Sequence, residues 1–320
     1  MSMKIAIIGA GMAGLSAART LAAAGADCTV FDKSRGLGGR MATRRVNDLQ
    51  FDHGAQYFTA RGPRFQSRLA HWYDQGVVAE WLPGKWVGSP AMTAPARALA
   101  EGLKVIREYR VTTLAGGPGC WRLLSEDAPG NPIREDSFEA VVMALPAPQV
   151  APLAASAGIR FIELERVRYA PCITLLLAFD EATGLQEASL SPPDGPIAWI
   201  ARNNTKPGRS GALETLVVHA TPEWSRAHLE DSDERMTDTL LRALRPYIGP
   251  VDPVFRMIHR WRFARLEQTA GVPYVWDPAR QVGACGDWAG GPRVEAAFDS
   301  GEAMAAALLQ TRLPDPQPRR

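Results

Sequence analysis

The chain has 320 residues, of which 36 are basic and 34 are acidic, so its net charge is only +2. With 22% charged and 46% hydrophobic residues, it is neither a disordered chain nor a nucleic-acid binder that works through bulk charge. The length is sufficient for two domains, or one large one, with an ample apolar core. Because no apolar run reaches the roughly 18 residues of a membrane span, we expect a soluble protein without a membrane partner.

Cysteine and histidine residues give no sign of a metal or redox centre. Cys28, Cys120, Cys172 and Cys285 are far apart and form no CxxC pair. This pattern is typical of reduced, buried thiols and predicts a cytoplasmic location. The five histidines show neither HxxxH nor HExxH spacing, so we predict no metal site.

The first elements predict a β-α-β unit. Residues 4–8 are a short apolar strand, residues 15–24 an Ala/Leu-rich helix, and residues 28–31 a second strand that Asp32 closes. A Gly/Arg-rich loop is expected next, over residues 34–45.

Three glycines, Gly9, Gly11 and Gly14, form the pattern G-x-G-x-x-G between the first strand and the helix. There the glycines permit a tight turn, close approach of a pyrophosphate and close packing of the helix, whose free N–H groups and positive dipole end attract phosphates. Asp32 is placed to accept hydrogen bonds from the ribose of an adenosine. The agreement of strand, helix, second strand and acid predicts dinucleotide binding rather than a chance Gly-rich turn.

The remaining elements change in character along the chain. Before residue 150 we predict one helix and then three short strands, over residues 64–73, 110–113, 120–124 and 138–144. The middle of the chain predicts an antiparallel sheet, because turns rich in Pro, Gly and Asn separate its strands at residues 173–179, 197–201 and 213–219. A helical stretch with Thr221 or Ser232 as N-cap, two strands and an Ala-rich helix follow, over residues 221–245, 254–263, 282–285 and 293–309.

Two further segments indicate which dinucleotide is bound. Residues 36–40, Gly-Leu-Gly-Gly-Arg, follow the second strand, where a nicotinamide-binding domain has no need of another Gly/Arg loop. Gly286 and Asp287 precede the last helix and offer an acid to ribityl hydroxyls. The positive end of the helix that starts near Arg293 favours the charge that builds on a flavin ring during reduction. These features predict FAD.

The same motifs, together with Gly38-Gly39-Arg40-Met41, resemble the flavin amine oxidase superfamily. More specific segments resemble the bacterial renalase group and are spread over nearly the whole chain: residues 31–36, 54–61, 86–92, 218–225, 259–261 and 285–288. The chain departs from that group at one place. Only Leu82-Pro83-Gly84-Lys85 separates Trp81 from Trp86, where we expect renalases to carry a longer insertion.

The resemblance implies an α/β fold. It consists of a Rossmann-type FAD-binding domain, discontinuous in sequence, and an antiparallel-sheet substrate domain of the p-hydroxybenzoate hydroxylase type. The FAD-binding domain is expected in three parts, residues 1–75, 93–150 and 263–320. The substrate domain is expected to comprise residues 76–92 and 151–262.

The motifs and the resemblance together imply the residues of the site. Those expected to bind FAD, without a covalent bond, are Gly9, Gly11, Met12, Ala13, Gly14, Asp32, Lys33, Gly39, Arg40, Met41, Ala55, Gln56, Val111, Gly286, Asp287, Arg293, Val294 and Glu295. Those expected to contact the substrate are Phe58, Thr59, Ala60, Arg61, Met92, His219 and Trp288. A structural role explains His219 equally well, and core packing explains Met92 equally well.

The resemblance further implies an activity. Renalases oxidise misreduced nicotinamide dinucleotides, the 2-dihydro isomers in the bacterial members, to NAD(P)+, and dioxygen then reoxidises the flavin and yields hydrogen peroxide. A dihydropyridine gives up one hydride without losing a proton from nitrogen, so we assign no general base. The protein has to hold the donor carbon about 3 to 3.5 Å from flavin N5.

Arginines rather than lysines dominate the presumed substrate regions. Only Lys4, Lys33, Lys85, Lys104 and Lys206 occur in the chain. Guanidinium forks suit phosphate oxygens, so six arginines could bind the diphosphate of a dinucleotide substrate: Arg61, Arg202, Arg226, Arg260, Arg262 and Arg265. Arg61 is favoured because it lies in a renalase-like segment, whereas a solvated surface position is the commoner explanation for each of the others.

Two other functions stay open. The first is an oxidase or dehydrogenase of amines or another small substrate, with a small pocket and an aromatic pair facing flavin N5. Apart from such a pair, five aromatic residues are expected to wall the ring pocket of a renalase-type oxidase, with plain core packing as the alternative: Tyr57, Phe58, Trp199, Trp224 and Trp288. The second is a non-catalytic flavin-binding or redox-sensing protein, whose pocket on the flavin face would be blocked.

Overall fold

The computed structural model describes residues 2–125, 137–209 and 211–311. The chain divides into two compact units, each made of separate segments. The first unit comprises Met1–Gly39, Ala96–Arg168 and Leu266–Arg320, and the second comprises Arg40–Pro95 and Tyr169–Arg265.

These boundaries differ from the predicted domain boundaries by three residues at 93–95 and 263–265, and by longer segments at two places. Residues 40–75 were expected in the FAD-binding domain but belong to the second unit, where Phe51 of β4 (Leu49–Asp52) packs against the apolar side chains of that unit's sheet. Residues 151–168 were expected in the substrate domain but belong to the first unit. There Ser156, at the end of helix α4 (Ala147–Ser156), accepts a 2.9 Å hydrogen bond from the backbone of Leu114.

A six-stranded sheet forms the centre of the first unit, in the order β16-β17-β10-β1-β2-β7. All neighbours pair in parallel except β16, which is an antiparallel edge strand. The bounds are β1 Lys4–Ile8, β2 Asp27–Phe31, β7 Lys104–Ile106, β10 Ala140–Met143, β16 Val275–Asp277 and β17 Val282–Ala284. Apolar β1 and β10 are almost entirely buried, as is usual for parallel strands covered on both faces. Because β1, β10 and β17 run parallel, their carboxyl ends meet at one edge of the sheet.

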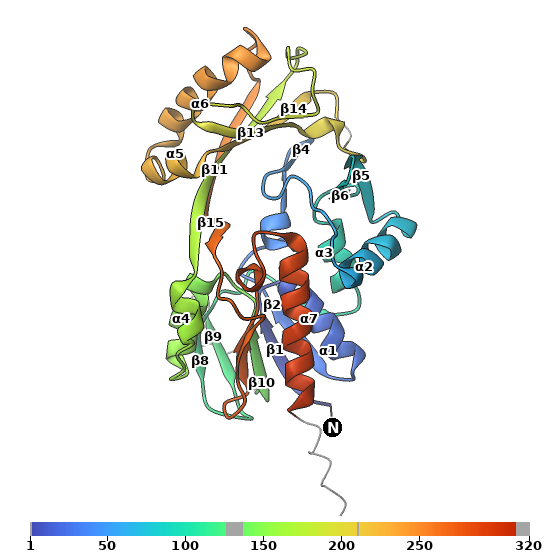
Figure 1. The fold of residues 1–320 in the computed structure, drawn as a ribbon, viewed down its shortest axis with the longest axis vertical. Coiled ribbons are helices and arrows are strands. Elements are labelled where there is room, and N and C mark those ends of the chain that lie inside the picture. Colours follow the sequence, from blue (N-terminus) through green and yellow to red (C-terminus); the bar gives the residue numbers. More distant parts are fainter. Residues whose placement is uncertain (1, 126–136, 210, 312–320) are drawn as a thin grey trace, which may run out of the picture. The chain divides into compact units, whose positions relative to one another are not determined.

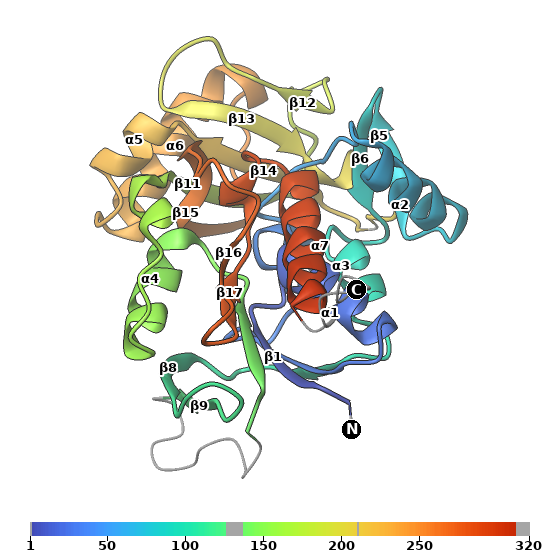
Figure 2. The same ribbon diagram turned by 60° about the horizontal axis from the view of Figure 1, so that its bottom comes forward.

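Helices α1 (Met12–Ala23) and α7 (Val294–Gln310) lie side by side in this unit, as Figures 1 and 2 show. Their contact depends on Gly301, because a Cβ there would overlap the carbonyl oxygen of Ala13 and the hydroxyl of Ser16. Ser16 Oγ also donates a 2.9 Å hydrogen bond to the carbonyl of Phe298. The amino-terminal halves of the two helices are thus held together.

The smaller elements of the first unit lie beside the large sheet. They are α4, the two-stranded sheet of β8 (Val111–Ala115) and β9 (Arg122–Ser125), and most of α3 (Ala94–Ala100). Cys28 and Cys285 are buried as predicted, but Cys120 is exposed because it lies in the turn before β9. Among the helices of the described residues, none has both the length and the apolar character that crossing a bilayer requires.

A five-stranded sheet forms the centre of the second unit, in the order β12-β13-β14-β11-β15. Strand β14 pairs with β11 and with β13, and β13 pairs with β12, all in the antiparallel direction, as predicted. The bounds are β11 Arg168–Phe179, β12 Ser189–Leu190, β13 Ile197–Arg202, β14 Glu214–Ala220 and β15 Phe255–Gln268. Side chains of β11 alternate between the faces: Leu175 and Leu177 belong to one apolar cluster, and Leu176 and Ala178 to another with Phe51.

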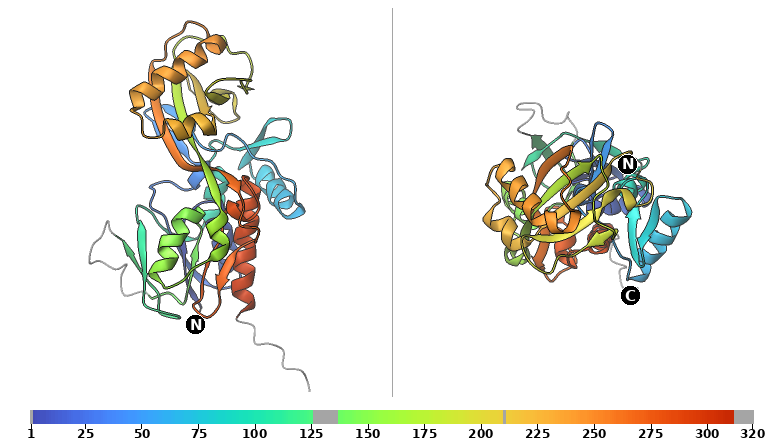
Figure 3. Two further views of the ribbon diagram at one scale, coloured as in Figure 1. Left: turned by 60° about the vertical axis from the view of Figure 1, so that its left-hand side comes forward. Right: turned by 90° about the horizontal axis from the view of Figure 1, so that it is seen from above.

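Helix α6 (Asp233–Ile248) covers one face of this sheet (Figure 3). It buries every fourth residue against the sheet, which is the spacing of one helix face: Met236, Leu240, Leu244 and Ile248. Ser232 accepts from the backbone of Arg235 and caps α6, and Thr221 accepts from Trp224 and caps α5 (Pro222–Ala227). Both predicted N-caps are confirmed, so the predicted helical stretch is two helices.

Two hairpins and helix α2 (Pro63–Asp74) complete the second unit. The strands of the hairpins are β3 (Thr43–Val46) with β4, and β5 (Val78–Leu82) with β6 (Lys85–Gly88). The first hairpin begins inside the predicted Gly/Arg-rich loop. Sequence patterning missed it because β3, Thr-Arg-Arg-Val, has no buried residue.

The contact between α1 and α7 can be tested at Gly301. We expect Gly301→Val to lower the free energy of unfolding by roughly 2 to 3 kcal/mol, because overpacking a tight contact forces backbone shifts. Gly117→Ala is the control, since a Cβ at Gly117 meets nothing within 4 Å; this change should stay within about 0.5 kcal/mol of the wild type. Urea unfolding measures both, and equal stability of the two variants would contradict the tight contact.

Candidate functional site

The turn between β1 and α1 needs glycine at Gly9 and Gly14 for its own packing, and Gly11 differs from both. Gly9 has φ +110°, and a Cβ there would overlap the carbonyl of Ala144 at the end of β10. A Cβ at Gly14 would overlap the carbonyl of Gly9, so Gly14 permits close packing of the helix on the turn. Gly11 is different, because its Cβ would meet nothing within 4 Å. Among the residues that the structure describes, no packing contact requires glycine there, which is consistent with a ligand that approaches the backbone.

Asp32 links this turn to the loop after β2. Its Oδ2 accepts a hydrogen bond of 2.7 Å from the backbone N–H of Ala10, and its Oδ1 accepts one of 2.7 Å from Ser34. Each carboxylate oxygen has a second acceptor position, so ribose hydroxyls can still bind. Lys33, beside it, is exposed.

The second glycine loop folds back onto the first. The backbone N–H of Gly38 donates to the carbonyl of Ala10 at 2.9 Å, and a Cβ on Gly39 would lie 3.6 Å from the Cα of Gly11. Both residues have positive φ, +99° and +55°, which favours glycine. The sequence interpretation of two loops that form one binding surface is therefore consistent with the geometry.

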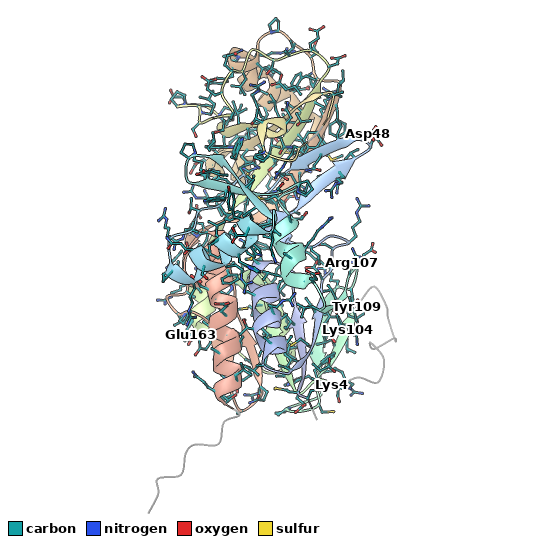
Figure 4. All side chains as sticks on the ribbon, turned by 90° about the vertical axis from the view of Figure 1, so that its right-hand side faces the viewer. Lys4, Asp48, Lys104, Arg107, Tyr109 and Glu163 are labelled. Atoms are coloured by element: carbon teal, nitrogen blue, oxygen red, sulfur yellow. The ribbon has the colours of Figure 1, made fainter. Side chains whose placement is uncertain are left out.

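The segment from β7 to β8 runs beside Asp32. The backbone of Asp32 bonds to Ile106 at 2.9 Å and to Tyr109 at 3.0 Å, and Arg107 donates to the carbonyl of Arg35. Arg107 and Tyr109 are labelled in Figure 4. Val111, predicted to contact the cofactor, follows directly as the half-buried first residue of β8.

The carboxyl end of β17 carries the other predicted acid. The backbone N–H of Cys285 donates to Met143 at 3.1 Å, which holds the ends of β17 and β10 together. Gly286 and the buried Asp287 follow, and a Cβ on Gly286 would come within 2.5 Å of Trp288 Nε1. The predicted residues at both ends of the chain thus meet at one edge of the sheet.

Two helix starts at this edge fit an anionic cofactor. The N-caps of α1 and α7 are Gly11 and Arg293, and neither caps its helix with a side-chain hydrogen bond. Met12, Ala13 and Val294 therefore lie at helix starts whose N–H groups and positive dipole ends favour phosphate or a reduced ring. Glu295, 3% exposed, lies in the first turn of α7. These residues suit the pyrophosphate, ribose and ribityl groups of FAD.

The remaining predicted cofactor residues belong to the second unit. Arg40 lies with its guanidinium 5.5 Å from the ring centre of Tyr169, and its carbonyl accepts a 2.8 Å hydrogen bond from Ala55. Gly54 allows this contact, because a Cβ there would overlap the Arg40 carbonyl. Met41 is buried at the end of the short 3-10 helix Gly39–Met41, which also contains Arg40.

Gln56 is fixed by a buried ion cluster. Asp52 is fully buried and accepts from Arg209 Nη2 at 2.5 Å and from Lys206 Nζ at 3.4 Å. Lys206 also donates to Gln56 Oε1 at 3.1 Å, and Gln56 Nε2 donates to the carbonyls of Asp52 at 2.6 Å and Gly54 at 2.9 Å. These three bonds determine which end of the amide carries the oxygen.

The charges of this cluster shift one another's protonation. Burial raises the pKa of Asp52, but the charges of Lys206 and Arg209 outweigh it and hold that pKa below its usual range. Burial lowers the pKa of Lys206 to about 8, against the opposing effect of Asp52. The three groups together carry two positive charges and one negative charge when Lys206 is protonated.

His219 of β14 meets Gln56 within the second unit. The distance from Gln56 Nε2 to His219 Nε2 is 3.3 Å. Burial first, and then the charge of Lys206, lowers the pKa of His219 to about 4. The imidazole is therefore neutral near pH 7.

Two more histidines pack with Trp261 into an aromatic cluster. The rings of His53 and His259 are 4.7 Å apart, and Trp261 donates a 2.9 Å hydrogen bond to the carbonyl of His53. Burial and nearby charges lower the pKa of His53 to about 3 and that of His259 to about 4. The unit therefore holds three neutral imidazoles.

The predicted substrate residues differ in exposure. Phe58 is buried and packs on Phe65, and Met92 and Trp288 have no exposed surface. Thr59 and Ala60 are half-buried, whereas Arg61 is exposed. Trp288 belongs to the first unit and the others, including His219, to the second. Their substrate contacts stay predictions.

Arg202, Arg260 and Arg262, among the candidate arginines, form ion pairs with described acidic residues. Arg202 pairs with Glu214 at 2.8 Å, Arg260 with Asp233 at 2.6 Å and Arg262 with Glu230 at 2.6 Å. A guanidinium held this way is less suited to a substrate phosphate, so these positions favour ion pairing.

A surface hollow of about 570 Å³ beside α6 contains none of the predicted site residues.

Sequence reasoning missed Asp52, Lys206 and Arg209. Asp52 closes the apolar end of β4, which is a weak indication of a buried acid. Lys206 and Arg209 follow β13 in a Pro/Gly-containing stretch that is typical of an exposed loop, and only tertiary packing buries them.

Gly11→Asp separates a ligand role of Gly11 from a structural one. Aspartate is a favourable N-cap, so we expect the variant freed of FAD to be as stable as the wild type or slightly more so. Its carboxylate would meet the phosphates, and the Kd for FAD should rise about 100-fold or more, which corresponds to about 2.7 kcal/mol. Gly11→Ser, a neutral N-cap, should lose much less affinity. Fluorescence titration with FAD provides both values, and an unchanged Kd in Gly11→Asp would contradict the site.

His53 should make stability depend on pH. Below about pH 6.5 the unfolded chain protonates this histidine, whereas the folded chain keeps it neutral down to about pH 3. The free energy of unfolding should therefore fall as the pH is lowered through this range, by up to about 1.4 kcal/mol per pH unit, the slope for one proton. His53→Gln should flatten the dependence, while His71→Gln, at an exposed position, should not. Urea unfolding at several pH values measures the slope, and parallel curves for all three proteins would contradict a neutral buried His53.

Solved structures align with nearly the whole chain. A candidate protoporphyrinogen oxidase from Exiguobacterium sp. 255-15 aligns over 97% of this chain and 99% of its own, with a TM-score of 0.74 and 14% identity. A putrescine oxidase, bound to putrescine, aligns over 97% and 99% with a TM-score of 0.66 and 14% identity. Cyclohexylamine oxidase from Brevibacterium oxydans IH-35A aligns over 97% and 99% with a TM-score of 0.66 and 13% identity. At such identities the similarity shows the fold alone.

Curated relatives match only a short segment. The 4,4'-diapophytoene desaturase (4,4'-diaponeurosporene-forming) of Staphylococcus aureus (strain Newman) is 46% identical over 52 residues. These are 16% of this chain and 10% of the desaturase, so the match spans about a tenth of that relative's length.

Two family models match the chain. One, described as an NAD(P)-binding Rossmann-like domain, matches residues 7–75, and the other, described as a flavin containing amine oxidoreductase, matches residues 67–309. The second covers well over half of the chain and confirms the predicted fold class and the predicted cofactor, FAD. The protein therefore belongs to the family of flavin-containing amine oxidoreductases and is an FAD-dependent oxidoreductase.

Proposed function

We propose that this protein is an oxidase of renalase type that acts on the 2-dihydro isomers of NAD(P). The reaction consumes the dihydropyridine, dioxygen and a proton and gives NAD(P)+ and hydrogen peroxide. Bound FAD would supply the chemistry by accepting a hydride and passing two electrons to dioxygen. We also propose that the partner is a free dinucleotide in the cytoplasm, without nucleic acid or membrane.

The meeting of Gln56 and His219 is the observation that carries this proposal. The two residues lie 163 positions apart, in two of the segments that resemble renalases, and their side-chain nitrogens are 3.3 Å apart. Two segments that are far apart in the sequence and that both resemble renalases thus come into contact in the second unit. The neutral imidazole of His219 can donate to or accept from a carboxamide or a ribose hydroxyl, and Gln56 Oε1 keeps one acceptor position beside its bond from Lys206.

The protonation states around Gln56 also support a hydride donor that needs no base. The low pKa of His219 makes it a poor proton acceptor near pH 7, and the Lys206 amine is bound to Asp52 and Gln56. An amine substrate arrives as a cation and has to lose a proton before it can donate a hydride. A dihydropyridine arrives ready to react.

Amine oxidation is the second candidate. The family membership favours it, and two of the solved structures with this fold are named as oxidases of the amines putrescine and cyclohexylamine. A third outcome, a flavin protein without turnover, is distinguished by the same experiment.

The test is anaerobic mixing of the yellow holoprotein with 2-dihydro-NAD, with NADH and with a series of primary amines. We expect 2-dihydro-NAD to bleach the flavin absorbance at about 450 nm, with a rate at least 100-fold higher than the rate with NADH or any amine. Admission of oxygen should then restore the colour with one hydrogen peroxide per NAD+. Fast bleaching by amines alone would overturn the renalase proposal in favour of amine oxidation, and no bleaching by any donor would indicate a non-catalytic flavoprotein.

His219→Gln supplies a matched variant for this experiment. Glutamine keeps a donor and an acceptor but not their geometry. We expect the apparent Kd for 2-dihydro-NAD to rise about 10-fold, which corresponds to the loss of one or two hydrogen bonds, while the FAD content stays unchanged. Wild-type kinetics in this variant would show that His219 is only structural.

A further inference from the structure

Lys206 is a buried ammonium with three kinds of contact. Its side chain has no exposed surface. Nζ lies 3.4 Å from Asp52 Oδ2, 3.1 Å from Gln56 Oε1 and 5.2 Å from the ring centre of Trp81. The last distance is within the roughly 6 Å over which an aromatic face attracts a cation. Because removal of an ammonium from water is unfavourable, its retention inside the unit needs an explanation.

Neutralisation of Asp52 does not explain the burial of Lys206. Arg209 donates to Asp52 Oδ2 from Nε at 3.1 Å and from Nη2 at 2.5 Å. Asp52 Oδ1 accepts from Thr43 Oγ1 at 2.8 Å and from the backbone of Met92 at 3.2 Å. The contact of Lys206 with the same carboxylate is longer than each of these bonds. Arg209 and Asp52 already form a neutral pair, so the charge of Lys206 is in excess.

The excess charge lies directly behind the amide of Gln56. Lys206 takes one acceptor position of Gln56 Oε1, and a second position is left for a ligand. A ligand nitrogen that donates there lies about 3 Å from Oε1 and therefore at most about 6 Å from Lys206 Nζ. Two positive charges at this separation inside a protein repel each other enough to weaken binding about 10- to 100-fold. A neutral amide group meets no such repulsion.

We propose that Lys206 is a specificity-determining residue that excludes cationic ligands from the contact with Gln56 and admits a neutral carboxamide. The inference rests on the proposed function, because it takes Gln56 as a residue that meets the substrate. One buried charge then discriminates between a dihydronicotinamide, whose ring and carboxamide are neutral, and a primary amine, which is a cation near pH 7.

The charges that face Lys206 come from three parts of the second unit. They are Asp52 at the end of β4, Arg209 after the short helix Asn203–Thr205, and His219 of β14. Burial lowers the pKa of Lys206 to about 8, with Asp52 opposing the shift and Arg209 adding to it. The pKa values of Asp52 and His219 are below their usual ranges. Above about pH 7, therefore, Asp52 stays an anion, His219 stays neutral, and Lys206 loses its charge.

Benzamide and benzamidinium test the discrimination in the holoprotein. They have nearly the same shape, one is neutral and the other is a cation, and neither can donate a hydride to the flavin. Calorimetric titration at about pH 7 should give the wild type a Kd for benzamidinium at least about 10-fold higher than its Kd for benzamide. As the pH is raised to about 9.5, the ratio of the two Kd values should fall toward one, because Lys206 loses its proton. This measurement needs no variant.

Two variants each remove the charge of one lysine. Lys206→Met should bring the ratio of the two Kd values close to one at about pH 7 and make it independent of pH. Lys104→Met is the matched control, because Lys104 is an exposed lysine of β7, labelled in Figure 4. The control should keep the wild-type ratio and its pH dependence.

Three results would overturn the role of Lys206. They are a ratio near one in the wild type at about pH 7, a ratio that persists at about pH 9.5 or in folded Lys206→Met, and Kd values above about 10 mM for both probes. The last would show that Gln56 offers no acceptor to a ligand. The bleaching experiment decides the proposed function separately. A protein that 2-dihydro-NAD bleaches, but whose ratio is near one, would keep the proposed function and lose the discrimination by Lys206.

Discussion

The absence of a side chain at three backbone contacts determines the cofactor end of the first unit. Gly14 allows α1 to start directly against the turn after β1, Gly9 allows that turn to touch the end of β10, and Gly301 allows α7 to touch α1. Any Cβ at these contacts would push α1 away from the turn, the turn away from β10, or α7 away from α1. The amino ends of α1 and α7 face the edge of the sheet at which the strands end. The positive potential of a helix end falls off within about one turn, so a small separation would weaken the attraction for a dinucleotide's phosphates.

In the second unit the corresponding constraint is electrostatic. Asp52 and Lys206 are fully buried and Arg209 is 2% exposed, and removal of one partner from such a cluster typically costs about 3 to 5 kcal/mol because it leaves a buried charge unpaired. Arg209 also donates to the carbonyl of Gly88, which joins β6 to the cluster. Burial lowers the pKa of His219, the charge of Lys206 lowers it further, and Lys206 also orients Gln56. The free energy of unfolding, the orientation of Gln56 and the protonation state of His219 therefore all depend on the same buried cluster.

The sequence predicted features that depend on local requirements and missed those that depend on distant partners. The glycine turn, Asp32 and the two N-caps, Thr221 and Ser232, were predictable because each is marked by a short sequence pattern: G-x-G-x-x-G between a strand and a helix, an acid at the end of a strand, and Thr or Ser before a helix. Neither the place of β4 in the second unit nor the burial of Lys206 could be predicted, since both follow from contacts with strands more than 100 residues away in the chain. The contact between Gln56 and His219 lies between these cases: resemblance pointed to both segments, and only the fold brought the two side chains together.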